Sequence, residues 1–259
     1  MSKNMDGKIK GRVWKNLLQT AVALVTLVVV WVAAHALVGN ELLIPDFSAC
    51  LKEVGKMLGK AAFWTAFWNT FRRVLIAFAL SFAFAAFFAV IAYLVPWFCR
   101  ILSPLVSFLR SLPTLAVLLI ILVWSGAAVA PVVVAFLSLF PMLYAGILAA
   151  LNEVDGALVD MSRVYRVPLR KQIFDLYLPS AAPYVLRESG AALAFSLKLV
   201  VSAEVLANTY RSLGGLMQEA KLYYEMPTLF ALVLLAFLLG LILETLGALA
   251  AEFVERRVK

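Results

Sequence analysis

Long, mostly apolar runs alternate along the chain with short segments that carry most of its charged residues. An α-helix needs roughly 20 apolar residues to cross the hydrocarbon core of a bilayer, which is about 30 Å thick. Residues 17–38, 74–95, 183–207 and 227–250 each have this length and an apolar character. Because lipid offers the backbone no hydrogen bonds, each of these runs predicts one membrane-spanning helix.

The longest run lies between Arg110 and Glu153 and contains 42 uncharged residues. One helix of that length would measure about 63 Å, twice the thickness of a single crossing. Two helices are therefore expected, with the turn between Ser125-Gly126 and Pro131. The hydrophobic pattern thus predicts an all-α, polytopic membrane protein of about six transmembrane helices.

Six crossings place both termini on one side, and Lys and Arg indicate which side. These residues are about twice as frequent in segments that would be cytoplasmic with the N-terminus inside, which predicts an N-in/C-in topology. The expected organisation is a cytoplasmic N-terminal segment at residues 1–16, a transmembrane domain at 17–251 with a cytoplasmic loop at 152–182, and a cytoplasmic tail at 252–259. Residues 46–60 are expected to form a short amphipathic helix on the membrane surface.

The cytoplasmic loop has an amphipathic pattern of its own. Val154, Leu158, Met161 and Tyr165 recur at spacings of four, three and four, which places them on one face of a helix. Val167-Pro168 is expected to end this helix, because the residue before a proline avoids helical backbone angles.

A second short helix is expected to follow in the same loop, with Pro168 as its first residue and its end near Pro179. Its apolar stripe consists of Leu169, Ile173 and either Leu176 or Tyr177. Two short amphipathic helices joined by a tight turn are thus predicted to project from the membrane on the cytoplasmic side.

Composition agrees with a membrane location, since 64% of the residues are hydrophobic and only 15% are charged. The net charge of +8 lies in short clusters between apolar runs, so membrane orientation explains it better than nucleic-acid binding. Cys50 and Cys99 lie in separate segments and indicate neither a disulfide framework nor a metal site, so both are expected to be small buried residues. His35 has no acidic neighbours and is expected to be structural.

The cytoplasmic loop resembles that of ABC importer permeases, whose pattern is Glu-Ala-Ala, three residues, Gly, nine residues, then Ile-x-Leu-Pro. The matching residues are Asp160-Met161-Ser162, Arg166, and Leu176-Tyr177-Leu178-Pro179, at the family spacing. Arg166 stands where the family has glycine, which normally supplies a left-handed turn. Either the backbone is strained at Arg166 or Val167-Pro168 remakes the turn, and we expect the second.

Further motifs resemble the nitrate, sulfonate and taurine branch of this family: residues 69–75, 109–113, 202–204 and 213–216. The resemblance implies a type I ABC importer permease fold in the bacterial cytoplasmic (inner) membrane, crossing it several times. It also implies a second copy of the permease, expected to form a homodimer, two ATP-binding subunits and an extracytoplasmic solute-binding protein. Membrane lipid is a further partner and nucleic acid is not.

The chain contains no GxxxxGK[ST] phosphate loop, so we expect no enzyme activity and no cofactor in it, with ATP and Mg bound by the partner ATPase. No catalytic or metal-binding residue is predicted. The residues expected to couple to the ATPase are Val154, Leu158, Asp160, Met161, Ser162, Tyr165, Arg166 and Pro168. The alternative is that this loop helix lies flat on the lipid headgroups.

Lys198, Glu204 and Glu244 interrupt apolar spans, where an ionisable group is costly unless it meets a partner or water. All three are candidates for the solute path. Lys198 and Glu204 are six residues apart and point about 120° from one another, so they are not expected to pair directly. For Lys198, pairing with another helix and snorkelling to an interface stay open as alternatives.

Two other functional classes differ from an importer permease in the motifs that they require. An ATP-independent secondary transporter or channel would show matching half-helices in two repeats, and no convincing pair occurs. A membrane enzyme would show a catalytic motif such as HExxH, which is absent. The expected solute is a small organic or inorganic anion, a sulfonate or a pyrimidine vitamin precursor, the classes that the resembling branch transports.

Overall fold

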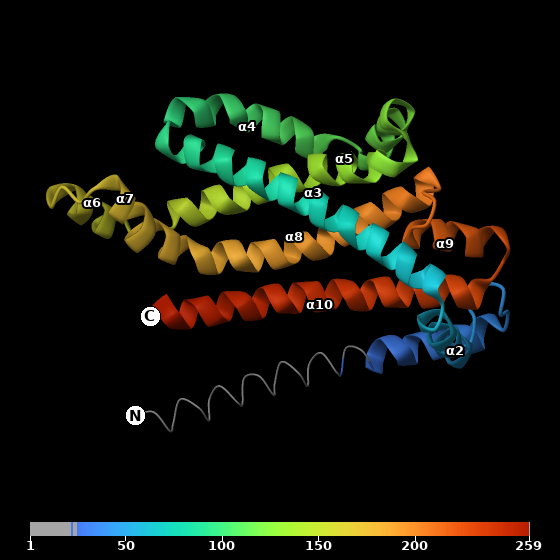
Figure 1. The fold of residues 1–259 in the computed structure, drawn as a ribbon. Helices are drawn as coiled ribbons and strands as arrows, with labels where there is room; N and C mark the ends of the chain where they lie inside the picture. Colours follow the sequence, from blue (N-terminus) through green and yellow to red (C-terminus); the bar gives the residue numbers. More distant parts are fainter. Residues whose placement is uncertain (1–21, 23–24, 259) are drawn as a thin grey trace, which may run out of the picture. The chain divides into compact units, whose positions relative to one another are not determined.

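The computed structural model describes residue 22 and residues 25–258 of the 259-residue chain (Figure 1). Every regular element in these residues is helical. The predicted cytoplasmic segment at residues 1–16 and part of the first predicted span lie outside the described residues. The labelled helices are α2 (Phe47–Leu58), α3 (Ala61–Leu94), α4 (Pro96–Ser111), α5 (Thr114–Asn152), α6 (Gly156–Val164), α7 (Leu169–Lys171), the π-helix η1 (Gln172–Tyr177), α8 (Leu178–Ala207), α9 (Leu213–Leu222) and α10 (Met226–Val258).

Four helices are long and apolar enough to cross a membrane: Ala61–Leu94, Thr114–Asn152, Gln172–Ala207 and Met226–Glu255. A shorter apolar helix occupies Val25–Val38. The all-helical, multi-spanning fold class is therefore confirmed, whereas the number of six spans stays a prediction. Helix α2 occupies most of the segment that was predicted as a short helix at residues 46–60.

The described residues form two compact units, one of which contains the residues before Lys60 together with Ala220–Ala231. In this first unit, Trp31 packs edge-on against Phe47 and its Nε1 donates a 3.0 Å hydrogen bond to the carbonyl oxygen of Pro45. His35 Nδ1 lies 2.7 Å from the carbonyl oxygen of Ile44. These contacts agree with a structural role for His35.

The second unit contains Lys60–Glu219 and α10 from Leu232 onward. Its core is built from α3, α5 and α8, which pack against one another. On the C-terminal half of α3 the buried face consists of small residues at a spacing of four, including Ala77, Ser81, Ala85 and Ala89, while Trp68 and other large side chains of α3 are exposed. Small residues inside and large apolar residues outside are typical of helices that pack within lipid.

Gly126 divides α5 into two helical parts, with φ 73° and ψ 169° at the break. The turn that was predicted between residues 125 and 131 is thus confirmed. Residues 114–125 rise only about 18 Å and cannot cross a bilayer alone. Helix α4 precedes them and packs against α3 and α5. The third predicted crossing, which was expected to begin after Arg110, therefore stays a prediction.

Cys50 is fully buried in α2, as predicted. Cys99 of α4 is only partly buried, so the prediction of a buried residue is wrong at that position. The reason is that α4 turns much of its surface outward, with Trp97 and Ile101 both exposed.

Helices α8 and α10 cross at a pair of glycines. A Cβ atom added to Gly190 would lie 2.6 Å from Gly247 Cα, which is closer than real side chains approach. The two backbones therefore meet at a distance that only glycine permits.

We expect Gly190→Ala to destabilise this crossing by about 1–3 kcal/mol, because the helices must separate to admit a methyl group. The matched control is Gly240→Ala on the same pair of helices, where a Cβ would meet only Leu197 Cδ2 at 3.9 Å. Thermal unfolding in detergent measures the melting temperature of both variants. Equal melting temperatures for the two variants would contradict the close crossing.

Candidate functional site

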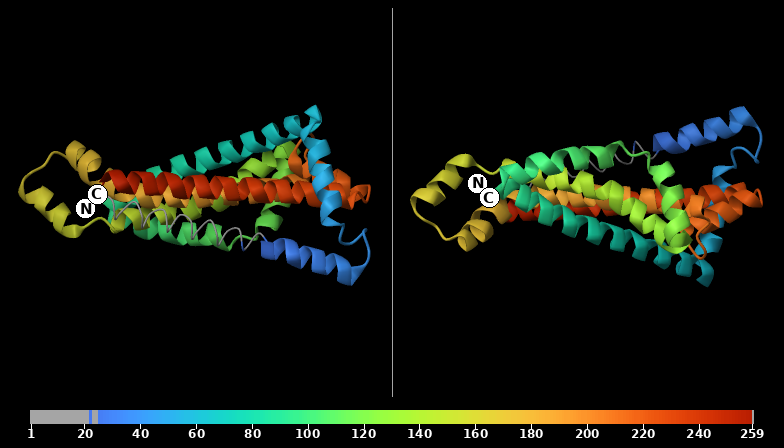
Figure 2. Two further views of the ribbon diagram at one scale, coloured as in Figure 1. Left: turned by 90° about the horizontal axis from the view of Figure 1, so that it is seen from below. Right: turned by 90° about the horizontal axis from the view of Figure 1, so that it is seen from above.

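The predicted loop helix is present as α6, and Figure 2 shows α6 and α7 beyond one end of the α3, α5 and α8 bundle. Asp155 starts α6 because its Oδ1 accepts a 2.9 Å hydrogen bond from the Ala157 N–H, which has no partner inside the helix. Leu158, Met161 and Tyr165 are 44%, 56% and 74% exposed. The apolar stripe of this helix is thus largely uncovered by the chain itself.

The end of α6 differs from the prediction. Arg166 adopts φ +49°, so this arginine itself supplies the left-handed residue for which the family uses glycine. The N–H of Val167 donates a 2.9 Å hydrogen bond to the carbonyl oxygen of Ser162, the bond that closes a Schellman motif. The expectation that Val167-Pro168 would remake the turn is therefore wrong, because the hydrogen bond requires a left-handed residue between the helix and Val167.

Arg166→Gly is expected to stabilise the end of α6 by about 1 kcal/mol, since glycine carries no Cβ penalty at positive φ. Amide hydrogen exchange at Val167 measures this directly and should slow about fivefold. Arg170→Gly is the matched control, because Arg170 lies within helix α7, where glycine costs about 1 kcal/mol. Faster exchange at Val167 in Arg166→Gly would contradict the strained turn.

The second predicted helix also extends further than expected. Helix α7 continues through η1 into α8, so the end that was predicted near Pro179 is wrong. The N–H of Leu178 donates to the carbonyl oxygen of Ile173 across a π-type turn. Pro179 follows the π-type turn inside this continuous helix and has no N–H to donate to the preceding turn.

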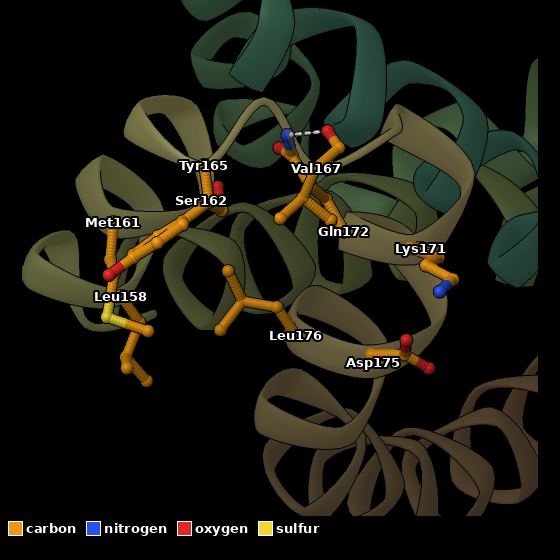
Figure 3. Close-up of a pocket in the computed structure, with 9 residues that line it drawn as sticks. All are labelled: Leu158, Met161, Ser162, Tyr165, Val167, Lys171, Gln172, Asp175 and Leu176. Atoms are coloured by element: carbon orange, nitrogen blue, oxygen red, sulfur yellow. Dashed lines mark hydrogen bonds between the residues drawn. The ribbon is translucent and has the colours of Figure 1, made fainter.

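A pocket of about 450 Å³ lies between α6 and the segment that contains α7 and η1 (Figure 3). The Gln172 side-chain amide donates a 2.8 Å hydrogen bond to the carbonyl oxygen of Val167 and ties the two walls together. Four predicted coupling residues line the pocket. The lining residues are Leu158, Met161, Ser162, Tyr165, Val167, Lys171, Gln172, Asp175 and Leu176.

The other predicted coupling residues lie elsewhere. Asp160, Arg166 and Pro168 are exposed but do not line the pocket. Val154 is only 8% exposed, so it is buried within the chain rather than available for docking. Val154 lies in the turn between the end of α5 and the start of α6, not on α6 itself, which explains the difference from the predicted stripe.

A buried ion pair joins α3 to the C-terminal part of α8. Glu204 has no exposed surface, and its Oε1 accepts a 2.8 Å hydrogen bond from Arg73 Nη1. Its Oε2 accepts hydrogen bonds from Thr70 Oγ1 at 2.8 Å and from the Gly214 N–H at 3.2 Å. The partners compensate the cost of burying this charge in an apolar span. This environment favours a structural role for Glu204, which the sequence placed among the solute-path candidates.

The region around the Arg73–Glu204 ion pair also makes hydrogen bonds to the start of the second helical part of α5. Pro131 has no N–H, so the carbonyl oxygen of Ala127 lacks its helical donor, and Thr209 Oγ1 donates to it at 2.9 Å. Arg73 Nε donates a 3.3 Å hydrogen bond to the carbonyl oxygen of Ala128. Arg73 thus contacts both α5 and α8.

Helix α9 is attached to this region through its first residues. The N–H of Leu213 donates a 2.9 Å hydrogen bond to Thr70 Oγ1. Gly214 leaves no room for a side chain, because a Cβ there would lie 2.4 Å from Glu204 Cβ. We call Thr70, Arg73, Glu204, Thr209 and the N-terminus of α9 the outer junction; it connects four helices.

The sequence did not predict Arg73 or Thr70 as partners of Glu204, although the motifs at residues 69–75, 202–204 and 213–216 were all noted. Those three motifs meet at the outer junction. A signal was available, because a carboxylate within an apolar span requires a cation or water nearby. Arg73 lies 131 residues away along the chain, and no local pattern links the two.

The other two predicted solute-path residues lie in exposed positions. Lys198 is exposed on α8 and Glu244 is exposed on α10. No ion pair within the described residues includes either of them. Their assignment to the solute path remains a proposal.

Comparison with known proteins gives one family match. Residues 82–259 match the family described as "Binding-protein-dependent transport system inner membrane component". A Brucella melitensis biotype 1 protein named "Probable ABC transporter permease protein" is 30% identical over 160 residues, which cover 60% of this chain and 65% of that protein. The match thus spans slightly less than two thirds of this relative. The taurine transport system permease protein TauC of Escherichia coli K12 is 26% identical over 158 residues, covering 59% and 57% of the two chains.

Solved structures with the same fold include a chain of the MetNI methionine ABC transporter in an inward-facing conformation. The TM-score is 0.66 at 16% identity, and the alignment covers 74% of this chain and 96% of that one. A chain from an amino acid ABC transporter gives a TM-score of 0.61 at 18% identity, with coverage of 82% and 98%. At these identities the likeness concerns the fold, and it confirms the predicted type I importer permease architecture.

Proposed function

Because the chain belongs to the family of binding-protein-dependent transport system inner membrane components, we propose that it is the transmembrane permease subunit of a bacterial ABC importer. In this role two copies form the solute path across the cytoplasmic membrane. Two separate ATPase subunits bind ATP and Mg on the cytoplasmic side, and an extracytoplasmic binding protein delivers the solute. The chain itself carries out no reaction.

The observation that carries this proposal is the uncovered apolar pocket beside α6. Leu158, Met161 and Tyr165 expose apolar surface on and directly after α6, which lies outside the candidate spans. Apolar surface of this kind gains free energy when a partner buries it, at about 25 cal/mol per Å². A groove or side chain of an ATPase subunit is the partner that fits the family.

The solute class that we propose is a small anion, with sulfonates as the leading candidates and pyrimidine vitamin precursors as the second. The named relative TauC supports the sulfonate choice, because its name describes taurine transport. An ATP-independent secondary transporter or channel is the alternative function. It would leave the α6 pocket without an ATPase to fill it.

Affinity purification of the tagged chain from its native membrane tests the proposal. We expect a complex that contains two copies of this chain and two of an ATPase, measured by native mass spectrometry. Reconstituted into vesicles with its binding protein, the complex should require ATP for uptake. A particle that contains this chain alone and still transports solute would contradict the proposal and support the secondary transporter.

A further inference from the structure

One face of α8 is left uncovered along most of its length. Successive residues of a helix are 100° apart, so side chains at spacings of three and four lie within a band about 100° wide. Most residues in this band are exposed, whereas Ser180, Glu188, Ala191 and Val205 are half-buried. The uncovered α8 face consists of Tyr184, Arg187, Ala191, Phe195, Lys198, Ser202 and Leu206.

The charge on this face is positive. Arg187 and Lys198 are its charged residues, and it includes no carboxylate. Glu204 points about 120° away from Lys198 and is neutralised by Arg73 inside the protein. Glu188 turns toward α5, where its Cγ would lie 2.8 Å from a Cβ added to Gly146.

Glu244 of α10 is the remaining acid to consider. Gly190 and Gly247 mark the crossing of α8 and α10, and Leu197 lies against Gly240, so the helices are antiparallel and Glu244 lies level with residue 193. Lys198 is therefore about 7.5 Å further along the axis. No ion pair joins the two residues within the described part of the chain.

A lysine in the middle of a span costs at least about 2.5 kcal/mol if it faces lipid, so an unpaired one indicates a watery or anionic environment. Ser202 lies one turn away on the same face and offers a hydroxyl donor. We propose that Lys198 and Ser202 form an anion-binding position in the solute path, suited to a small solute with a sulfonate, carboxylate or phosphate group. This inference rests on the proposed function, since it places the uncovered α8 face along the path.

The test uses Ser202→Cys in the purified complex, with Cys99 replaced by serine. Cys50 stays, because it is fully buried and burial raises the pKa of its thiol to about 11. Two thiol reagents of similar size are compared, the anionic 2-sulfonatoethyl and the cationic 2-(trimethylammonio)ethyl methanethiosulfonate. At about 6 Å in water one positive charge raises the local concentration of a monovalent anion roughly threefold and lowers that of a monovalent cation by the same factor. Lys198 should therefore shift the ratio of the two labelling rates about tenfold.

We expect Lys198→Met to abolish this preference for the anionic reagent and Lys198→Arg to retain it. Excess methanesulfonate should slow labelling by the anionic reagent in the parent with Lys198 and in Lys198→Arg, but not in Lys198→Met. Arg187→Met is the matched control, because it removes a charge from the same face about 22 Å away, beyond the screening length of about 10 Å.

Two results would overturn the anion site. In the first, neither reagent labels Ser202→Cys, which would show that lipid or the second copy covers this face. The other is a rate ratio that Lys198→Met leaves unchanged. The amount of ATPase that co-purifies is measured on the same preparations. If the Ser202→Cys parent lacks the ATPase, the proposed function is contradicted. If the ATPase is retained, either negative labelling result contradicts the anion site alone.

Discussion

Arg73→Met is expected to lower the free energy of unfolding by about 3–5 kcal/mol, the cost of removing one partner from a buried ion pair. Glu204 has no exposed surface, so the carboxylate cannot turn to water when the guanidinium is lost. The substitution also removes the donor to the carbonyl oxygen of Ala128. Reversible unfolding in mixed detergent micelles measures the change.

Arg72→Met is the matched control for this prediction. Arg72 is the neighbouring residue on α3 and carries the same charge, but its side chain is exposed. A surface substitution of this kind should change stability by no more than about 0.5 kcal/mol. Equal destabilisation by the two variants would show that Arg73 acts through general charge rather than through Glu204.

A double variant separates the buried charge from the loss of packing. In Arg73→Met with Glu204→Gln, the amide oxygen can still accept from Thr70 and Gly214, and no charge is left buried. Replacing both members of a buried ion pair is often nearly neutral. The double variant should therefore recover most of the stability that Arg73→Met loses, and additive losses would contradict this account of the outer junction.

Much of the fold follows from the length and spacing of apolar runs. Helix-length runs between charged segments predict α3, the second half of α5, α8 and α10, because the bilayer fixes the number of residues in a crossing. The turn at Gly126 could be predicted within the 42-residue run, because that run is too long for a single crossing. Helix α4 was not predicted, because Arg100 and Arg110 interrupt its apolar pattern.

The site was predictable only where local periodicity determines it. The stripe of Leu158, Met161 and Tyr165 follows from helical spacing, and the structure leaves these residues exposed. Val154 belongs to the same periodicity but is buried, because tertiary packing at the end of α5 is not encoded in that spacing. The left-handed Arg166 could not be read from residue preference, which favours glycine there.

Met161→Asp should weaken association with the ATPase subunits by about a hundredfold if the α6 pocket is the docking surface. Met161 lines the pocket and is 56% exposed, so its remaining apolar surface is available for burial by a partner. A carboxylate there would enter the contact without a partner, and a penalty of about 3 kcal/mol corresponds to roughly a hundredfold in the dissociation constant. Membrane insertion should be unaffected, because α6 lies outside the candidate spans.

Val164→Asp gives the matched control on the same helix. Val164 is 79% exposed but does not line the pocket, so this variant adds the same charge to α6 without placing it in the pocket. ATPase retention after purification and ATP-dependent uptake in vesicles are measured for both variants, with Met161→Leu as the conservative substitution. We expect Met161→Leu and Val164→Asp to retain most of the ATPase. Full retention and full uptake in Met161→Asp would exclude the pocket as the coupling surface, and equal losses in both acidic variants would show that the charge of α6, rather than insertion into the pocket, controls docking.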